Sequence, residues 1–322
     1  MVNQNNNETN DFSQVSWQEI DEHSVGQRID NFLMRILKGV PKSRVYRILR
    51  KGEVRVNKKR AKPDYKLKLG DQLRIPPIRV AQKNDNELIL PAWVRAAIDQ
   101  PIFEDEAMIA INKPSGLAVH GGSGIEFGLI EAMRQLKPDW PFLELVHRID
   151  RETSGCILLA KSRTVLNELH TQFRREAGQV GKSYLALLSG DLSEITTVNS
   201  ALLQSRDEKG MKRVNVDESG QSAKSTFMPL ETFKQASYVR IQLYTGRMHQ
   251  ARVHAASLDL PILGDKIYGD WEANRAMKPL GVKRCMLHAE RYQLNHPLTG
   301  KLVQFKAPMP EDFERALQAL SE

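Results

Sequence analysis

The stretch Glu144–Gly155, ELVHRIDRETSG, carries a dense set of charged and titratable side chains between two apolar segments, LELV and CILLA. Within six residues it places His147, Arg148, Asp150, Arg151 and Glu152. We expect the neighbouring arginines to keep Asp150 ionised, and an ionised carboxylate can act as a nucleophile or a base. Taken alone, the loop favours a plain ion-paired turn, because ion pairs in such turns are commonly structural.

Length and composition describe an ordinary globular protein. The chain has 322 residues, of which 41% are hydrophobic and 27% charged, enough for two domains with a substantial core. No run is long enough to span a membrane, and the opening MVNQNNNETNDFSQ has no signal-peptide pattern. Cys156 and Cys285 lie beside apolar residues, as buried reduced thiols do. We therefore expect a cytoplasmic protein, away from membranes, that works as a monomer.

The positive charge is concentrated in one segment. Residues 28–83 contain eighteen Lys and Arg against four Asp and Glu, whereas residues 1–27 contain five acids and no Lys or Arg. The net charge of the whole chain is +8, so the rest of the chain is close to neutral. A basic excess confined to a domain-sized segment is typical of a module that binds a polyanion. The alternative, a face that only aids solubility, usually mixes both signs.

The basic segment has the pattern of a small independent unit over residues 25–83. Apolar residues at helical spacing across residues 29–37 predict one helix. Ser43 is placed to cap a second helix, whose apolar stripe is Val45, Ile48 and Leu49. Short strands are expected at residues 53–57 and 71–76.

This unit resembles the S4 RNA-binding domain in its paired helices, the turn LRKGEVRVNKKR and the closing KLKLGDQLRI. The resemblance implies that the second helix and the following turn bind RNA phosphates, a salt-sensitive interaction that reads little sequence. The side chains expected to do so are Arg44, Arg47, Arg50, Lys51, Lys58, Lys59 and Arg60. Residues 1–24 are predicted to be a disordered leader, and residues 84–98 a linker.

Residues 99–322 alternate between strand and helix patterns. Strand patterns occur at residues 108–112, 182–190, 237–246 and 286–297, and helix patterns at residues 128–136 and 164–176. Many non-local strands with few helices predict an α+β fold built on a mixed, largely antiparallel sheet with flanking helices.

The sequence lacks the motifs of several common catalytic and cofactor-binding sites. There is no phosphate-binding P-loop, and no dinucleotide fingerprint occurs between a strand and a helix. The histidines lack metal-ligand spacing, and two distant cysteines cannot form a zinc finger. Ser115 and Ser154 have no nucleophile-elbow context. We therefore expect neither a metal nor a cofactor.

Four stretches together resemble the RluA-type pseudouridine synthases. In chain order they are NKPSGLAVHGG, HRIDRETSG, KSYLALLSG and TGRMHQARVHAASLDLPILGDKIYG. The resemblance implies that residues 99–322 form a catalytic domain that isomerises uridine to pseudouridine in RNA, without metal or cofactor. The N-glycosidic bond breaks and the base is rejoined through carbon. The expected substrate is large-subunit (23S-type) ribosomal RNA or its assembly intermediates.

The resemblance also assigns roles to individual residues. Asp150 falls on the family's catalytic aspartate, which either attacks the anomeric carbon or takes a proton from the neighbouring sugar carbon. Tyr184 would stack on the flipped base, and Arg252 would pair with Asp150. Arg148 would enter the RNA stack when the target base leaves it. Without the resemblance, Tyr184 would be interpreted as core, Arg252 as a structural ion pair and Arg148 as a solvated charge.

Other residues of these motifs are expected to be structural. The hydroxyls of Thr153 and Ser154 would hold the loop locally, and Gly155 would permit a tight turn. Met248 and Ala251 depart from the family pattern, where a hydroxyl and a branched apolar residue are usual, so the packing of the uracil pocket is open. The alternative function is a non-catalytic RNA-binding or ribosome-assembly factor that retains the fold. A hydrolase has no supporting motif.

Overall fold

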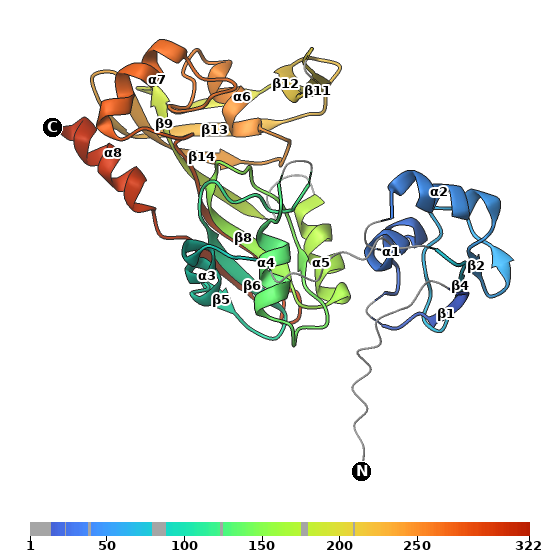
Figure 1. The fold of residues 1–322 in the computed structure, drawn as a ribbon. Coiled ribbons are helices and arrows are strands. Elements are labelled where there is room, and N and C mark those ends of the chain that lie inside the picture. The colour runs from blue at the N-terminus through green and yellow to red at the C-terminus, as the bar shows by residue number, and fades with distance from the viewer. Residues whose placement is uncertain are drawn as a thin grey trace. The chain divides into compact units, whose positions relative to one another are not determined.

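The computed structural model describes residues 14–22, 24–37, 40–78, 88–122, 125–174, 180–208 and 210–322 (Figure 1). The chain divides into two compact units, Met1–Glu87 and Leu88–Glu322. The predicted leader over residues 1–13 and the predicted linker over residues 84–87 lie outside the described residues. None of the helices in the described ranges combines the length and hydrophobicity needed to cross a membrane.

The first unit is a four-stranded antiparallel sheet with two helices. In chain order its elements are β1 (Ser16–Glu19), α1 (Ile29–Ile36), α2 (Lys42–Lys51), β2 (Arg55–Val56), β3 (Lys59–Arg60) and β4 (Gln72–Ile75). The apolar stripes of both helices are buried against the sheet in one hydrophobic cluster. The two predicted helices and the two predicted strands are confirmed.

Two predictions about the first unit are wrong. Ser16–Glu19, placed within the leader by composition, pairs with β4, and the adjacent Ile20 is buried in the hydrophobic cluster. A strand is stabilised by its partner's backbone, which the composition of a short polar segment does not reveal. Ser43 does not cap α2, because the helix begins at Lys42 after Pro41 and has no side-chain cap.

The second unit is built around a ten-stranded sheet in the order β10-β13-β14-β9-β15-β8-β6-β5, with β16 paired to β15 and β7 to β8. These strands are β5 (Phe103–Glu104), β6 (Met108–Lys113), β7 (Glu144–Leu145), β8 (Ser154–Ala160), β9 (Gly181–Ser189), β10 (Thr196–Asn199), β13 (Lys224–Thr232), β14 (Ala236–Leu243), β15 (Leu287–Asn295) and β16 (Leu302–Lys306). Among the described strands, only β8 and β15 pair in parallel. The mixed, largely antiparallel sheet is confirmed.

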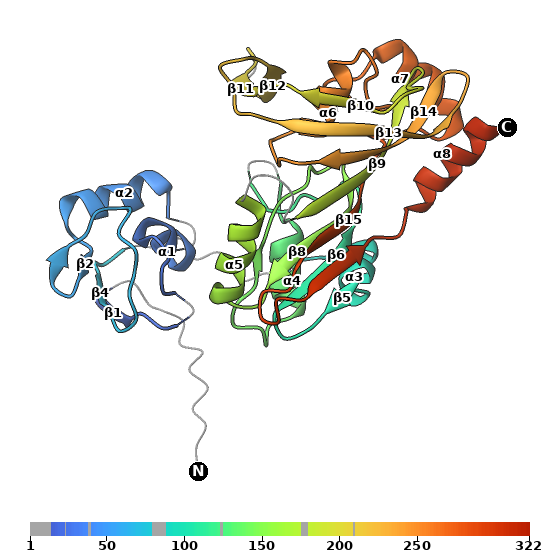
Figure 2. The same cartoon turned by 180° about the vertical axis from the view of Figure 1, so that it is seen from behind.

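Helices cover this sheet in two groups (Figures 1 and 2). Near β6 and β8 lie α3 (Ala92–Asp99), α4 (Leu129–Leu136) and α5 (Arg163–Arg174), whose apolar residues enter the main core. Beside β9 and β14 lie α7 (Trp271–Met277), the 3-10 helix η1 (Lys278–Leu280) and α8 (Glu311–Ser321), which share a second cluster. The fold is therefore α+β, as expected.

The linker prediction is wrong where α3 begins. Residues 92–98 are helical, and Val94 and Ile98 are fully buried in the core of the second unit. The apolar spacing in this short helix follows a polar segment, so composition alone assigned both to one linker.

A separate hairpin was not predicted. It consists of β11 (Leu202–Arg206) and β12 (Lys212–Val216) and stands beside the main sheet (Figures 1 and 2). Its Leu202 and Val214 pack against Val253 of α6 (Gln250–Ala256) in a small hydrophobic cluster.

Gly155 sets the approach of two central strands. It lies in β8 opposite Ala289 of β15, with φ +114°, and a Cβ added there would lie 2.3 Å from the Ala289 carbonyl oxygen. The predicted tight turn is therefore not the reason for glycine, since the residue is inside a strand. Close backbone approach and positive φ both exclude a side chain.

We predict that Gly155→Ala destabilises the second unit by roughly 3 kcal/mol, because left-handed strain adds to a backbone clash. Gly300→Ala is the matched control, since Gly300 also has positive φ, +69°, but open space around it. Its loss should be only about 1–2 kcal/mol. Urea unfolding followed by circular dichroism measures both, and equal losses would contradict the close-approach explanation.

Candidate active site

The loop that carries Asp150 connects β7 to β8 and is held from below by the turn after β6. Lys113 is fully buried, and its Nζ donates to the carbonyl oxygens of Pro114, Leu117 and Arg151 at 2.9, 2.8 and 3.2 Å. Burial lowers the pKa of Lys113 to about 7, although the charge of Asp150 opposes this. Three carbonyl acceptors thus tie the two loops together through one ammonium group.

Two further hydrogen bonds join the same loops. Ser115 Oγ donates to the Glu152 carbonyl at 2.6 Å, and the Gly116 N–H donates to the Arg151 carbonyl at 2.8 Å. These contacts explain why the NKPSG motif accompanies the HRID motif. Lys113 belongs to the NKPSG motif but was not predicted to have a role. The only indication in the sequence was a lysine at the end of an apolar strand.

Residues flanking Asp150 anchor the loop to the core. The His147 ring stacks on Phe173 with centroids 5.0 Å apart, and its Nε2 accepts the Leu158 N–H at 3.2 Å. Burial lowers the pKa of His147 to about 3, so the ring is neutral and can accept that bond. Ser154 Oγ bonds His288 Nδ1 on β15 at 3.0 Å, a long-range contact rather than the expected local one.

Arg252 joins two carboxylates. Its Nη1 donates to Asp150 Oδ2 at 3.0 Å, and its Nε and Nη2 donate to the two oxygens of Asp265, both at 2.7 Å. The side chains of Arg252 and Asp265 are 7% and 1% exposed, whereas Asp150 is 20% exposed. The contact expected between Arg252 and Asp150 is therefore present, and of the two carboxylates that accept from Arg252, Asp150 is the more exposed.

The buried pair keeps its charges because each partner compensates the other. Burial alone would raise the pKa of Asp265, but the hydrogen bonds and charge of Arg252 outweigh it and hold that pKa below its ordinary value. Burial would likewise lower the pKa of Arg252, and Asp265 and Asp150 raise it instead. No role was predicted for Asp265. An acid within the apolar run LPILGDKIYG was the feature of the sequence that could have indicated a buried carboxylate.

Tyr184 lies on β9 and is 8% exposed. Its hydroxyl is 2.6 Å from that of Tyr292, and the two rings meet edge-on at 74°. Burial raises the pKa of Tyr184, and the negative charge of Asp150 adds to this. The phenol is therefore protonated at neutral pH. It can serve as a hydrogen-bond donor or as a ring on which a nucleobase stacks.

The segment before Arg252 is fixed by Gln250. Its Oε1 accepts from Thr245 Oγ1 at 2.7 Å and from the Arg247 N–H at 3.0 Å, while its Nε2 donates to the Lys224 carbonyl at 2.9 Å. Of the two departures, Ala251 is buried in the main core, and Met248 packs on the hairpin cluster beside Tyr268.

The predicted RNA-binding residues belong to both units. Arg148 is exposed on the Asp150 loop of the second unit. In the first unit, α2 and the β2–β3 turn carry the basic set, of which Arg44 is half-buried and Arg47, Arg50, Lys51, Lys58, Lys59 and Arg60 are exposed.

Comparison with known proteins agrees with this arrangement. The family model described as RNA pseudouridylate synthase matches residues 107–257, and that of the S4 domain matches residues 27–73. The chain is 47% identical over 312 residues to ribosomal large subunit pseudouridine synthase C of Haemophilus influenzae, covering 96% of both proteins. The corresponding protein of Escherichia coli K12 is 48% identical over 300 residues, covering 92% of this chain and 93% of its own.

The chain belongs to the RNA pseudouridylate synthase family. Solved structures share its fold. Human RNA pseudouridylate synthase domain containing 4 has a TM-score of 0.58 at 25% identity, over 71% of this chain and 95% of that one. Human RNA pseudouridylate synthase domain containing 1 has a TM-score of 0.55 at 24% identity, over 69% and 87%. Both resemblances expected from the sequence are confirmed.

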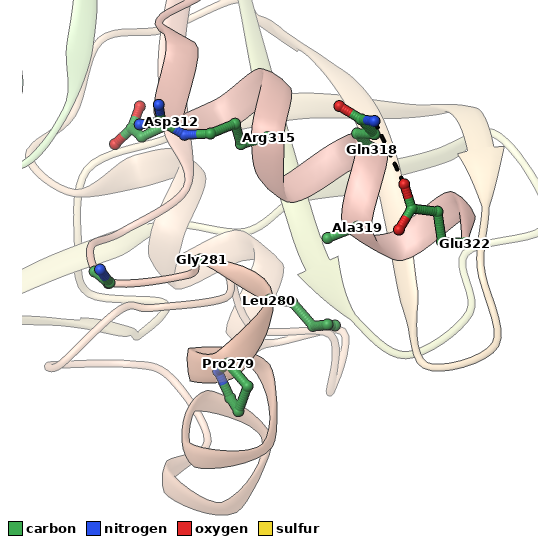
Figure 3. A pocket seen from close by; sticks show the side chains of 9 residues that line it. Pro279, Leu280, Gly281, Asp312, Arg315, Gln318, Ala319 and Glu322 are labelled. Atoms are coloured by element: carbon green, nitrogen blue, oxygen red, sulfur yellow. Dashed lines mark hydrogen bonds between the residues drawn. The ribbon is translucent and has the colours of Figure 1, made fainter.

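Within this pseudouridylate synthase, an open surface pocket lies apart from the candidate site. It measures about 420 Å³ and is bounded by the η1 turn and α8 (Figure 3). Its lining residues are Pro279, Leu280, Gly281, Lys283, Asp312, Arg315, Gln318, Ala319 and Glu322. None of them is a residue expected to act on RNA. In the described part of the chain, no three His, Cys, Asp or Glu side chains gather as a metal site requires.

We predict that Asp265→Asn lowers the free energy of unfolding by roughly 3 kcal/mol, because it leaves the buried Arg252 with a single carboxylate partner. Glu311→Gln is the control. Glu311 pairs with Arg315 at 3.5 Å on the surface of α8, where the two side chains are 87% and 69% exposed. Its loss should stay within about 1 kcal/mol. Urea titrations at pH 7 measure both.

The difference between wild type and Asp265→Asn should depend on pH. Since the folded-state pKa of Asp265 is depressed, its contribution is complete above the ordinary value of 3.8 and is lost as pH falls through the lower folded value. Acid titration of stability should therefore bring the two proteins together below that value. A difference that stays constant into strong acid would contradict an ionised Asp265.

Proposed function

We propose that this chain isomerises uridine to pseudouridine in ribosomal RNA of the large subunit, with Asp150 as the catalytic residue. The observation that carries the proposal is the carboxylate of Asp150, partly exposed and bound to a buried Arg252. Support for the substrate comes from relatives named for the ribosomal large subunit, which match almost the whole chain.

The geometry suits a carboxylate that reacts at the sugar. Arg252 binds Oδ2 of Asp150 and leaves Oδ1 to face the substrate. That oxygen either attacks the anomeric carbon or takes a proton from the neighbouring sugar carbon, and in both cases uracil leaves with the bonding electrons. The base then turns and its C5 bonds to the anomeric carbon, either as the ester between Asp150 and that carbon breaks or as the proton taken from the neighbouring sugar carbon is returned to it. C5 then loses a proton and N1 gains one. The product is an isomer, so no other reactant is needed.

Tyr184 is proposed to bind the extruded base. A base must leave the RNA stack to be reached, and an aromatic side chain in the pocket partly replaces the lost stacking. Since burial raises its pKa, Tyr184 stays protonated at neutral pH. It therefore acts as a stacking surface for the nucleobase or as a hydrogen-bond donor, and not as a proton acceptor. Arg148, exposed on the same loop as Asp150, is proposed to fill the space left in the RNA.

The basic residues of the first unit are proposed to capture RNA through its phosphates. The exposed side chains on α2 and on the β2–β3 turn place their charges on adjacent elements. Such contacts raise affinity without selecting a sequence. We further propose that the protein acts as a monomer and that it works in the cytoplasm. The two free, buried cysteines support a reducing compartment.

The alternative is an RNA-binding or ribosome-assembly factor without catalysis. The S4 unit fits both functions. The intact contact between Asp150 and Arg252 favours the enzyme, because a binding factor gains nothing from holding a partly exposed carboxylate against a buried cation.

We predict that Asp150→Asn lowers pseudouridine formation by at least roughly 10³-fold, because the amide keeps the shape but neither attacks nor takes a proton. Pseudouridine mapping of unmodified large-subunit RNA and of assembly intermediates measures this. Asp139→Asn, an exposed aspartate elsewhere in the second unit, should retain full activity. Full turnover by Asp150→Asn would overturn the assignment, and an inactive wild type on both substrates would favour the assembly factor.

We also predict that changing Arg47, Arg50 and Lys51 to Gln weakens RNA binding and makes it less salt-dependent. Each lost phosphate contact should reduce the slope of log affinity against log salt by about 0.7–0.9. The same charge change at Lys234, Arg275 and Lys278, all exposed in the second unit, should leave the slope unchanged. Filter binding at several salt concentrations measures both, and equal slopes in the two triple variants would argue against the S4 unit as the binding surface.

A further inference from the structure

Arg252 by itself does not fix the orientation of Asp150. The forked face of its guanidinium is occupied by Asp265, so Asp150 receives a single contact, from Nη1 to Oδ2. One contact leaves a carboxylate free to turn about its Cβ–Cγ bond. A reaction at Oδ1 needs that oxygen placed to within a fraction of an ångström.

His249 is the side chain that faces Oδ1. Its Nε2 lies 3.8 Å from Asp150 Oδ1, and its Nδ1 lies 2.8 Å from the hydroxyl of Tyr268. The ring is mostly buried between them, and it meets Tyr268 edge-on with centroids 5.5 Å apart. The series of contacts from Tyr268 through His249 thus ends at Oδ1 of Asp150, the oxygen that Arg252 leaves unbound.

The backbone of His249 is held in an unfavourable conformation to reach this place. Its φ of 54° and ψ of 17° are left-handed, which costs a non-glycine residue about 1–2 kcal/mol. The residue sits directly before α6, and the four hydrogen bonds of the Gln250 amide hold the preceding turn. Strain that the surroundings enforce at such a position is typical of functional sites.

The contacts of Tyr268 and Asp150 together favour one tautomer of His249. The Tyr268 hydroxyl oxygen accepts the Val214 N–H at 3.0 Å, which leaves its own proton available for His249 Nδ1. With Nδ1 as the acceptor, the neutral ring has its proton on Nε2, directed at the carboxylate. The opposite tautomer would point a lone pair at a negative oxygen.

Burial favours the neutral form of the His249 ring. Burial lowers its pKa, and the positive charges of Arg252 and Arg148 lower it further, while Asp150 and Asp265 oppose this. A neutral ring donates one hydrogen bond and adds no second cation beside Arg252.

We propose that His249 is a positioning residue for Asp150, whose Nε2–H donates to Oδ1, and that Tyr268 selects the tautomer that makes this possible. The contact shortens to a hydrogen bond as substrate fills the site, as catalytic contacts commonly do. With both oxygens held by residues 249 and 252 at the start of α6, the carboxylate has one orientation. This role rests on the proposed function of Asp150.

The first test compares His249→Ala with His249→Gln. The alanine should lower kcat by roughly 10- to 100-fold with little change in KM, because misorientation affects the reaction more than RNA binding. The glutamine amide can place an N–H near the position of Nε2 and should recover most of the loss. Both replacements carry a Cβ at the same left-handed backbone, so strain is matched. An unchanged kcat in His249→Ala would overturn the proposal.

The second test uses Tyr268→Phe, which keeps the ring beneath Arg252 but removes the hydroxyl. Both tautomers of His249 then become accessible, so kcat should fall several-fold at pH 8 relative to wild type. The deficit should shrink only as pH falls through the lowered pKa of His249, below the ordinary 6.5, because the imidazolium carries a proton on Nε2 whatever the tautomer. A deficit that is the same at every pH would indicate a merely structural tyrosine and would overturn the role given to Tyr268.

His254→Gln is the matched control. His254 lies on α6, the helix that directly follows His249, and is fully buried, but it bonds Ser225 and the Ser200 carbonyl instead of Asp150. This variant should lose stability and keep its kcat. Nitrogen-15 spectra of histidine-labelled protein give a readout independent of activity. They should show His249 with its proton on Nε2, and a proton on Nδ1 would overturn the inference even if the wild type proved inactive on every RNA.

Discussion

The buried ion pair of Arg252 with Asp265 is the interaction on which the candidate site depends. A guanidinium that is 7% exposed cannot remain there without a carboxylate that takes its fork, and Asp265 supplies one at 1% exposure. Only the remaining Nη1 reaches Asp150. Asp265 therefore stabilises the charge of Arg252, whereas Asp150 stays partly exposed and accepts one hydrogen bond from the same guanidinium.

The sheet brings distant segments to this pair. The Asp150 loop is fixed below by Lys113 at the end of β6 and at its far end by β8, which approaches β15 closely because residue 155 is glycine. Strand β9 contributes Tyr184, and α6 contributes Arg252. A change in any of these supports would move the carboxylate without touching it, so the site is a property of the whole second unit.

The two units differ in net charge. The first unit holds the basic excess on α2 and the β2–β3 hairpin, where the side chains can bind the phosphates of RNA of any sequence. The second unit, which is nearly neutral overall, encloses the few charges that need a defined geometry. If Asp150 is the catalytic residue, as proposed, selection among uridines comes from the shape around Asp150 and from the fold of the RNA, because phosphate contacts carry no sequence information.

Sequence patterns determined the elements with strong periodicity and the basic unit, and the family motifs singled out Asp150, Tyr184 and Arg252 as candidates, because apolar spacing and motifs are local properties of the chain. They misplaced Ser16–Glu19 and α3, since a short strand or helix is stabilised by what it packs against. Asp265, Lys113 and His249 had ordinary surroundings in the sequence, and only folding placed them within reach of Asp150 or its loop. Burial, tautomer and the choice of partner depend on distances between residues a hundred positions apart, so the tertiary structure alone decided them.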